Sequence, residues 1–262
     1  GGYLVRRLSG GGAVFHDLGN LNFTFIVRKP DYDVDRQLQV ILEAVRRLGI
    51  QAEKTGRNDI TVEGRKFSGN AFYQTGDCCY HHGTLLVHAD KENMSRYLNV
   101  PREKLASKGV SSVKSRVANL DEFCPGLTVD RVKAALAEAF SQVYGQVAEK
   151  MEEKELPEDA IGPLTEKFES WQWKYGRKIP FEHEMEQRFA WGGIQMQFHV
   201  DGGRIQEVNV FSDAMDQELI GNLSERLKGC PYDGNAMCEA VKEAGTEGGI
   251  RQDILSLIKE SM

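Results

Sequence analysis

Three consecutive glycines at positions 10–12 are the feature that most constrains how this chain can fold. Glycine loses more backbone entropy on folding than any other residue, so a run of glycines is expected where the backbone must approach something closely. Arg6, Arg7 and Ser9 stand just before the run. Bare N–H groups beside an arginine fork suit an anion, so the segment predicts a loop that holds a phosphate or a carboxylate. The alternative interpretation is a flexible turn between two strands.

The glycine run is not specific by itself, because it matches neither the GxxxxGK[ST] phosphate loop nor the GxGxxG dinucleotide motif. Four further blocks follow it: GRNDI at 56–60, GRKFSGNA at 64–71, HGTLL at 82–86 and KGVSSVKSRVAN at 108–119. With these blocks in this order, the chain resembles the lipoate-protein ligases over nearly its whole length. Biotin ligases are related in fold, but they carry an arginine-rich GRGRRGR pattern where this chain has SGGGAV.

The resemblance implies an α/β (α+β) architecture. A mixed-sheet catalytic domain of the biotin/lipoate ligase type is expected at residues 1–165, and a small α+β accessory domain at residues 166–262. Hydrophobic periodicity predicts strands at 3–5, 22–27, 60–62, 66–73, 82–87, 187–191, 194–200 and 205–211, and helices at 33–48, 128–144 and 216–227. Residues 146–167 are expected to be a helix end and a linker. The segment 101–120, which is rich in basic residues, is expected to be a mobile flap that closes over phosphate with Gly109 as its hinge, with a solvated basic loop as the alternative.

The resemblance also implies an activity in two half-reactions. Lipoate and Mg-ATP would give lipoyl-AMP and pyrophosphate. The lipoyl group would then pass to a lysine of a lipoyl-accepting protein, an E2 subunit of a 2-oxoacid dehydrogenase or the glycine cleavage H protein. The first step brings two anions together, so a cation between them is the main requirement. Lys66 is the candidate, because it follows the tight Glu63-Gly64 turn and precedes two small residues, Ser68 and Gly69, that leave room for ligand.

The other expected site residues come mainly from the resemblance. Arg7 is expected on a nucleotide phosphate or on the lipoyl carboxylate, and His82 near the ligand. Asp59 is expected to hold Mg²⁺, with an Asx turn as the alternative. Further lipoate or ATP contacts are expected from Ser9, Gly10, Gly11, Gly12, Ala13, Val14, Phe15, Asn58, Asn70 and Gly83, and an adenylate-binding loop from Lys108, Gly109, Ser112, Val113, Lys114 and Arg116.

Two other functions stay open at this point. A related acyltransferase would move octanoyl or lipoyl groups between carrier proteins without ATP, through a thioester on Cys78 or Cys79. A non-catalytic relative would bind lipoate or an acceptor protein without chemistry. Zinc is not favoured at His81 and His82, because no cysteine or aspartate stands at a matching spacing.

Composition narrows the setting of the protein. The net charge of −6 disfavours nonspecific binding to nucleic acid, and no apolar run approaches the length of a membrane span. Five cysteines, two of them adjacent, do not suggest a disulfide framework, so a reducing, cytoplasmic location is expected. A monomer is the default expectation. The chain begins at Gly1 without a methionine, and the family's further N-terminal segment, which helps to wall the lipoate pocket, is expected to be missing from it.

Overall fold

The structure is a computed structural model and describes residues 2–55, 59–98, 116–176, 178–244 and 249–262. The chain forms two compact units. One unit spans Ala13–Met151, and the other combines Gly1–Gly12 with Glu152–Met262. The glycine run therefore groups with the C-terminal part of the chain. The domain boundary at residue 165 stays a prediction.

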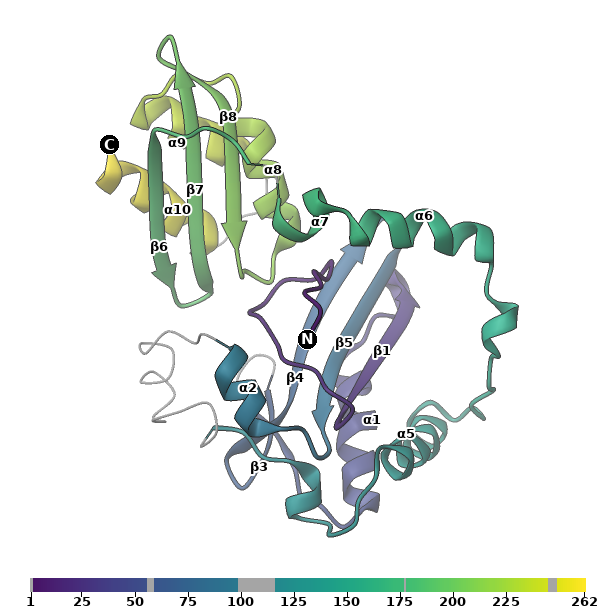
Figure 1. Cartoon of the computed structure of the whole chain (residues 1–262). Helices are drawn as coiled ribbons and strands as arrows, with labels where there is room; N and C mark the ends of the chain where they lie inside the picture. The colour runs from purple at the N-terminus through teal and green to yellow at the C-terminus, as the bar shows by residue number, and fades with distance from the viewer. Residues whose placement is uncertain (1, 56–58, 99–115, 177, 245–248) are drawn as a thin grey trace. The chain divides into compact units, whose positions relative to one another are not determined.

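The unit Ala13–Met151 is built on a five-stranded antiparallel sheet in the order β1-β5-β4-β3-β2 (Figure 1). In the hairpin of β3 and β4, Glu63 and Gly64 both have positive φ, as two-residue turns that match the strand twist require. The α+β fold class and this predicted hairpin are confirmed, and the strands of the expected mixed sheet all pair antiparallel. The strands are β1 Asn20–Arg28, β2 Glu53–Thr55, β3 Asp59–Val62, β4 Arg65–Thr75 and β5 Cys78–Leu86.

Two helices cover one face of this sheet (Figure 1). α1 (Val34–Arg47) packs on α5 (Val129–Tyr144), and apolar side chains of both helices share a core with Phe67 and Leu85 of the sheet. Each large apolar side chain buried in this way stabilises the fold by about 1.5–3 kcal/mol. The Asp33 carboxylate caps α1 by accepting a hydrogen bond from a backbone N–H of the first turn. Both predicted helices are confirmed.

Strand register decides which residues lie on the opposite face of the sheet. Ile60 and Leu85 lie in the core beneath the helices. Successive strand residues point to opposite faces, so Asp59 and the residues paired in its row, Gly69 and Thr84, face away from α1 and α5. This face of the sheet, which also carries Lys66, is called the Lys66 face.

The second unit carries an antiparallel three-stranded meander of β6 (His183–Phe189), β7 (Gly192–Asp201) and β8 (Arg204–Ser212). Three helices share its hydrophobic core: α8 (Gln217–Leu227), α9 (Gly234–Glu243) and α10 (Gly249–Ser261). The predicted meander and the predicted helix at 216–227 are confirmed. The prediction of a turn at Gly192 and Gly193 is wrong, because these residues begin β7, where the Gly193 N–H donates to the Asp213 carboxylate at 2.6 Å.

Three other segments differ from the sequence predictions. Residues 3–5 form no strand and are exposed. β5 begins at Cys78 rather than at residue 82, because β1 and β4 pair with it along its whole length. The expected linker at 146–167 contains the first part of α6 (Glu158–Glu169), whose periodicity gives a weak signal because none of its residues is buried.

The remaining short elements complete the fold. The short helices are α2 (Lys91–Tyr97) and α7 (Trp171–Tyr175), and the single 3₁₀ turns are η1 (Lys29–Asp31), η2 (Leu120–Glu122) and η3 (Glu153–Glu155).

Two sequence predictions concern membrane spans and the flap. Among the described residues, no helix is long and apolar enough to cross a membrane. Residues 99–115, which include most of the predicted flap, lie outside the described part of the chain.

Candidate functional site

Two cations and one acid form a cluster at the start of β4. Nζ of Lys66 lies 2.6 Å from Oδ1 of Asp59, and Nη2 of Arg116 lies 3.2 Å from Oδ2 of the same carboxylate. The side chains of Lys66, Asp59 and Arg116 are 25%, 11% and 19% exposed, so they are shielded but still reach solvent. Among these three side chains, two cations face one carboxylate, so together they carry a net positive charge that can attract an anion.

The local backbone explains how Lys66 reaches Asp59. A bulge in the β3–β4 pair sets Lys66 opposite Thr61, while Asp59 stands opposite Gly69. The Lys66 side chain lies over Gly69, where an added Cβ would be 2.8 Å from Nζ and 3.0 Å from Cε. The room that the sequence predicts for ligand at this glycine is therefore taken up by the side chain of Lys66.

Arg116 comes to the cluster from a separate segment. Val117 forms a parallel bridge with Lys66, and the Ala118 N–H donates to the Lys66 carbonyl at 2.9 Å. This pairing holds Arg116 beside Asp59. The sequence predicts both Lys66 and Arg116 as site residues, and the structure brings them together. The periodicity of residues 101–120 gives no signal that Arg116 lies beside Lys66.

The contacts of Asp59 bear on the expected magnesium site. Both of its oxygens accept from cations in this structure. A divalent cation would have to displace one of these partners and would be repelled by the other. The described residues also contain no group of three or more His, Cys, Asp or Glu that could hold a metal ion. These residues therefore fit a resident Mg²⁺ poorly, and Asp59 acts here as an anchor for two cations.

The predicted anion loop is shaped by its own arginine. The Arg7 guanidinium donates to Ser9 Oγ at 3.1 Å, to the Gly10 carbonyl at 2.7 Å and to the Gly12 carbonyl at 2.9 Å. Gly11 has a φ of +93°, which favours glycine, and a Cβ there would lie 3.0 Å from the guanidinium. Arg7 thus closes the loop on itself, and its contact with an anion stays a prediction.

The residues after the glycines are placed in the other unit. Ala13 and Val14 are exposed. The ring of Phe15 stacks on that of Tyr97 in α2, with centroids 6.0 Å apart and planes 5° apart. This gives Phe15 a packing role, and the nucleotide contacts expected from all three residues stay predictions.

Asn70 lies on the sheet face opposite to Lys66. Its Oδ1 is 2.9 Å from Nε2 of His81, and the other ring nitrogen of His81 is 3.1 Å from Oε1 of Gln37. All three side chains are buried on the face that α1 covers. Burial and, to a smaller extent, the neighbouring His82 lower the pKa of His81 to about 4. This neutral, buried network was not predicted, although strand alternation places His81 and His82 on opposite faces.

The two other predicted residues of this region also divide between the faces. Gly83 points to the helix-covered face, opposite Phe23. His82 points to the Lys66 face, beside the ring of Tyr80 at 5.5 Å. The structure therefore keeps His82 near the expected ligand side and turns Asn70 away from it. Of the remaining candidates, Asn58, Lys108, Gly109, Ser112, Val113 and Lys114 lie outside the described residues.

The candidate thiol nucleophiles lie far from the cation cluster. Cys78 pairs with Thr75 at the end of β4 opposite to Lys66. Nine residues of strand separate the two ends, which corresponds to about 30 Å at the usual rise per residue. Cys79 is 1% exposed. It stands two residues before His81 on β5 and therefore points to the same helix-covered face. Neither thiol can act together with Lys66 in this structure.

Comparison with known protein families accounts for most of the chain. Residues 1–141 match the model described as the lipoyl protein ligase A/B catalytic domain. Residues 178–258 match the model described as the bacterial lipoate protein ligase C-terminus. The order of the two matches is the order that the sequence blocks predict.

Solved structures agree with these matches. P. falciparum LipL1, in complex with lipoate, has a TM-score of 0.80 and 29% identity, over 97% of this chain and 76% of that chain. A bi-partite lipoate protein ligase from Thermoplasma acidophilum, studied with its E2 lipoyl domain, has a TM-score of 0.56 and 33% identity, over 67% of this chain and 72% of that chain. A lipoate-protein ligase A bound with ATP has a TM-score of 0.56 and 30% identity, over 66% and 72%.

Proposed function

The chain belongs to the lipoate-protein ligase family, and we propose that it attaches lipoate to a lysine of a lipoyl-accepting protein in two steps that use ATP. The substrates are supported by the relatives. One similar structure contains lipoate, another contains ATP, and a third comes with its E2 lipoyl domain. The proposed acceptors are the E2 subunits of 2-oxoacid dehydrogenases and the glycine cleavage H protein.

In the first step, a carboxylate oxygen of lipoate attacks the α-phosphorus of ATP. The bond from this phosphorus to the bridging oxygen breaks, and pyrophosphate leaves with its electron pair. The product is lipoyl-AMP, a mixed anhydride. ATP enters as its magnesium complex, so the metal is part of the substrate.

Lys66 is proposed to lie between the two anions of this step. Two unit charges 4 Å apart interact by about 4 kcal/mol at an effective dielectric constant of 20, so an ammonium between them offsets a repulsion of that order. The observation that carries the proposal is the ion pair with Asp59, which fixes the Lys66 ammonium on the sheet face that points away from α1 and α5. Arg116, on the other oxygen of Asp59, is proposed to hold a nucleotide phosphate.

In the second step, the acceptor lysine supplies the nucleophile. Its neutral amine attacks the carbonyl carbon of lipoyl-AMP, the bond to the AMP oxygen breaks, and AMP leaves. The amine proton passes to solvent. The enzyme needs no nucleophile of its own, which agrees with the distance of Cys78 and Cys79 from Lys66.

Lipoate-dependent exchange of labelled pyrophosphate into ATP tests the proposal. Lys66→Met should lower the exchange rate by about 10²–10³-fold, because the cation between the reacting anions is lost. Lys133→Met is the matched control, since Lys133 lies on the outer side of α5 with a side chain 58% exposed. No exchange by the folded wild-type protein, or normal exchange by Lys66→Met, would refute the assignment.

The same preparation tests the thioester alternative. Transfer of an acyl group from a carrier protein in buffer without ATP, lost on combined substitution of Cys78 and Cys79 by serine, would identify an acyltransferase instead. Binding of lipoyl-AMP without formation of a lipoylated protein would identify a non-catalytic relative.

A further inference from the structure

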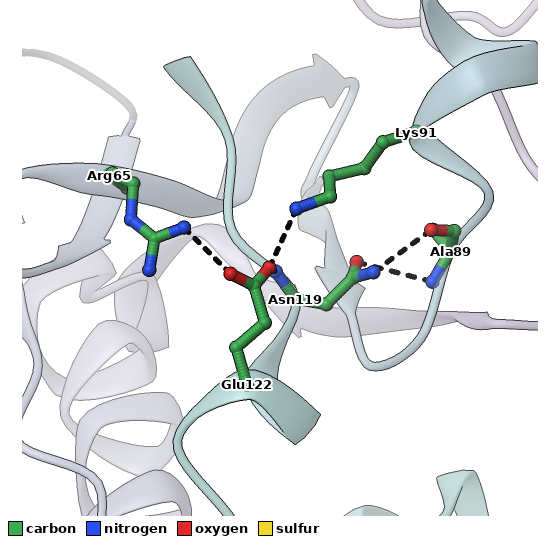
Figure 2. A network of polar contacts seen from close by, with 5 residues as sticks. All are labelled: Arg65, Ala89, Lys91, Asn119 and Glu122. Carbon is green, nitrogen blue, oxygen red and sulfur yellow. Dashed lines mark hydrogen bonds and ion pairs between the residues drawn. The ribbon is translucent and has the colours of Figure 1, made fainter. Parts of the chain in front are cut away.

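A second polar cluster is centred on Glu122 (Figure 2). Some of its residues are close in the sequence to members of the cation cluster formed by Lys66, Asp59 and Arg116. Oε2 of Glu122 is 2.7 Å from Nη1 of Arg65, and Oε1 is 2.8 Å from Nζ of Lys91. Oε1 also accepts from the backbone N–H of Asn119 at 2.7 Å. The side-chain amide of Asn119 in turn forms two hydrogen bonds with the backbone of Ala89: it donates to the carbonyl at 2.9 Å and accepts from the N–H at 3.2 Å. These five residues are called the Glu122 clamp.

The Glu122 clamp joins segments that are distant in the sequence and adjacent to the cation cluster. Arg65 begins β4 directly before Lys66. Asn119 ends the short segment that begins with Arg116 and pairs with Lys66. Glu122 therefore contacts the residue before one cation and the segment that carries the other. Figure 2 shows Arg65 and Lys91 reaching the Glu122 carboxylate from its two sides.

The charge state of Glu122 suits a fixed junction. Burial opposes its ionised form. Hydrogen bonds from the Lys91 side chain, from the backbone N–H of Asn119 and from the Arg65 side chain outweigh burial and lower the pKa of Glu122 to about 2. The carboxylate is therefore ionised at neutral pH. Its side chain is 30% exposed, and single ion pairs at such exposure add little stability. Two ion pairs and one backbone hydrogen bond on a single carboxylate do fix its geometry.

We propose that Glu122 is a positioning residue for the ligase reaction, which holds Arg116 in place relative to Lys66 by clamping the segment of Arg116 to the start of β4. The inference rests on the proposed function and extends it to a residue that acts through others. A misplacement of about 1 Å in such contacts can lower a rate by up to about 10²-fold. Loss of the clamp lets Arg116 move from Asp59, while Ala118 and Leu120 of the same segment stay in the core under α1 and α5.

Glu122→Gln tests the proposal, because it removes the charge and keeps the shape. Its kcat/KM for lipoate-dependent pyrophosphate exchange should fall about tenfold. Glu138→Gln is the matched control, since it removes an ion pair with Arg47 (3.0 Å) between α5 and α1. This control should stay within about twofold of the wild-type protein.

A double-variant cycle separates positioning from general loosening. In an Arg116→Ala background, Glu122→Gln should lower kcat/KM by less than about twofold, because the side chain that it positions is gone. An effect of Glu122→Gln that is equally large with and without Arg116 would overturn the proposal.

Hydrogen exchange gives a readout that does not depend on activity. Glu122→Gln should speed exchange of the Ala118 amide, which bonds to the Lys66 carbonyl, by about tenfold, and Glu138→Gln should not. Unchanged exchange at Ala118 would overturn the proposal even for an inactive protein. If the wild-type protein shows slow exchange at Ala118 but no pyrophosphate exchange, the proposed function fails instead. The cycle is then measured as the Kd for ATP alone by calorimetry, where additive effects would again overturn the positioning role.

Discussion

His81 should make the stability of the sheet-bearing unit depend on pH in a narrow window. Burial, followed by the effect of His82, lowers its pKa to about 4 from 6.5. Between these two values the unfolded chain binds a proton that the folded protein does not bind. Stability therefore falls as the pH drops from about 6.5 to about 4 and is independent of this group outside that window.

The size of the effect follows from the two pKa values. The difference between pKa values of 6.5 and about 4 corresponds to about 3 kcal/mol once both states are protonated. At intermediate pH the loss is about 1 kcal/mol at pH 5.5 and about 2–3 kcal/mol at pH 4.5. His81→Gln removes the titrating group and keeps an amide N–H that can donate to the side-chain oxygens of Gln37 or Asn70. The variant should lack this part of the pH dependence.

The assay must report on residues 13–151. All three tryptophans lie in the other unit, at positions 171, 173 and 191, so tryptophan fluorescence does not serve. Urea unfolding followed by hydrogen exchange of peptides from α1 and β5 measures the free energy directly, at pH 7 and pH 4.5. An NMR titration of the His81 ring gives its pKa in the folded state. A pKa near 6.5, or the same pH dependence in His81→Gln, would refute the reasoning.

Other predictions follow from the site. Gly69→Ala should lower pyrophosphate exchange by about tenfold or more with little loss of stability, because the added Cβ would lie 2.8 Å from Nζ of Lys66. Normal kinetics would show that Lys66 does not need its position over Gly69 for the reaction. Arg7→Lys should weaken ATP or lipoate binding in calorimetry, because lysine cannot reproduce the three-way donation that closes the loop; unchanged Kd values would contradict a role of the loop. Asp59→Asn should lower kcat more than it raises KM, since it unties both cations; a change in KM alone would argue for a role limited to binding.

Much of the fold could be predicted because local signals agree with the tertiary structure. The helix at 33–48 has an apolar stripe and a capping aspartate, and both features are used. The hairpin of β3 and β4 has a turn sequence, Glu63-Gly64, that fits its backbone. α6 was missed for the opposite reason: none of its side chains is buried, so its sequence carries no strong pattern to read.

The candidate site was predicted as a set of residues and not as an arrangement. Lys66 and Arg116 meet because Val117 pairs with Lys66, a contact between segments that no local pattern records. The bulge in the β3–β4 pair decides which residues share a row with Asp59, and a shift of one residue would reverse the faces. Asn70 shows the effect, because it belongs to the motif but points into the core.

The grouping of residues 1–12 with the C-terminal body means that the polypeptide crosses between the two bodies twice, after Gly12 and after Met151. The Gly11 N–H donates to the carbonyl of Asp213 at 3.1 Å, and Trp173 Nε1 donates to that of Arg6 at 2.7 Å. After a single protease cut near residue 151, these hydrogen bonds would still attach the N-terminal segment up to Gly12 to the C-terminal fragment. The nicked protein should migrate as one species in its native state and separate into two fragments only in denaturant.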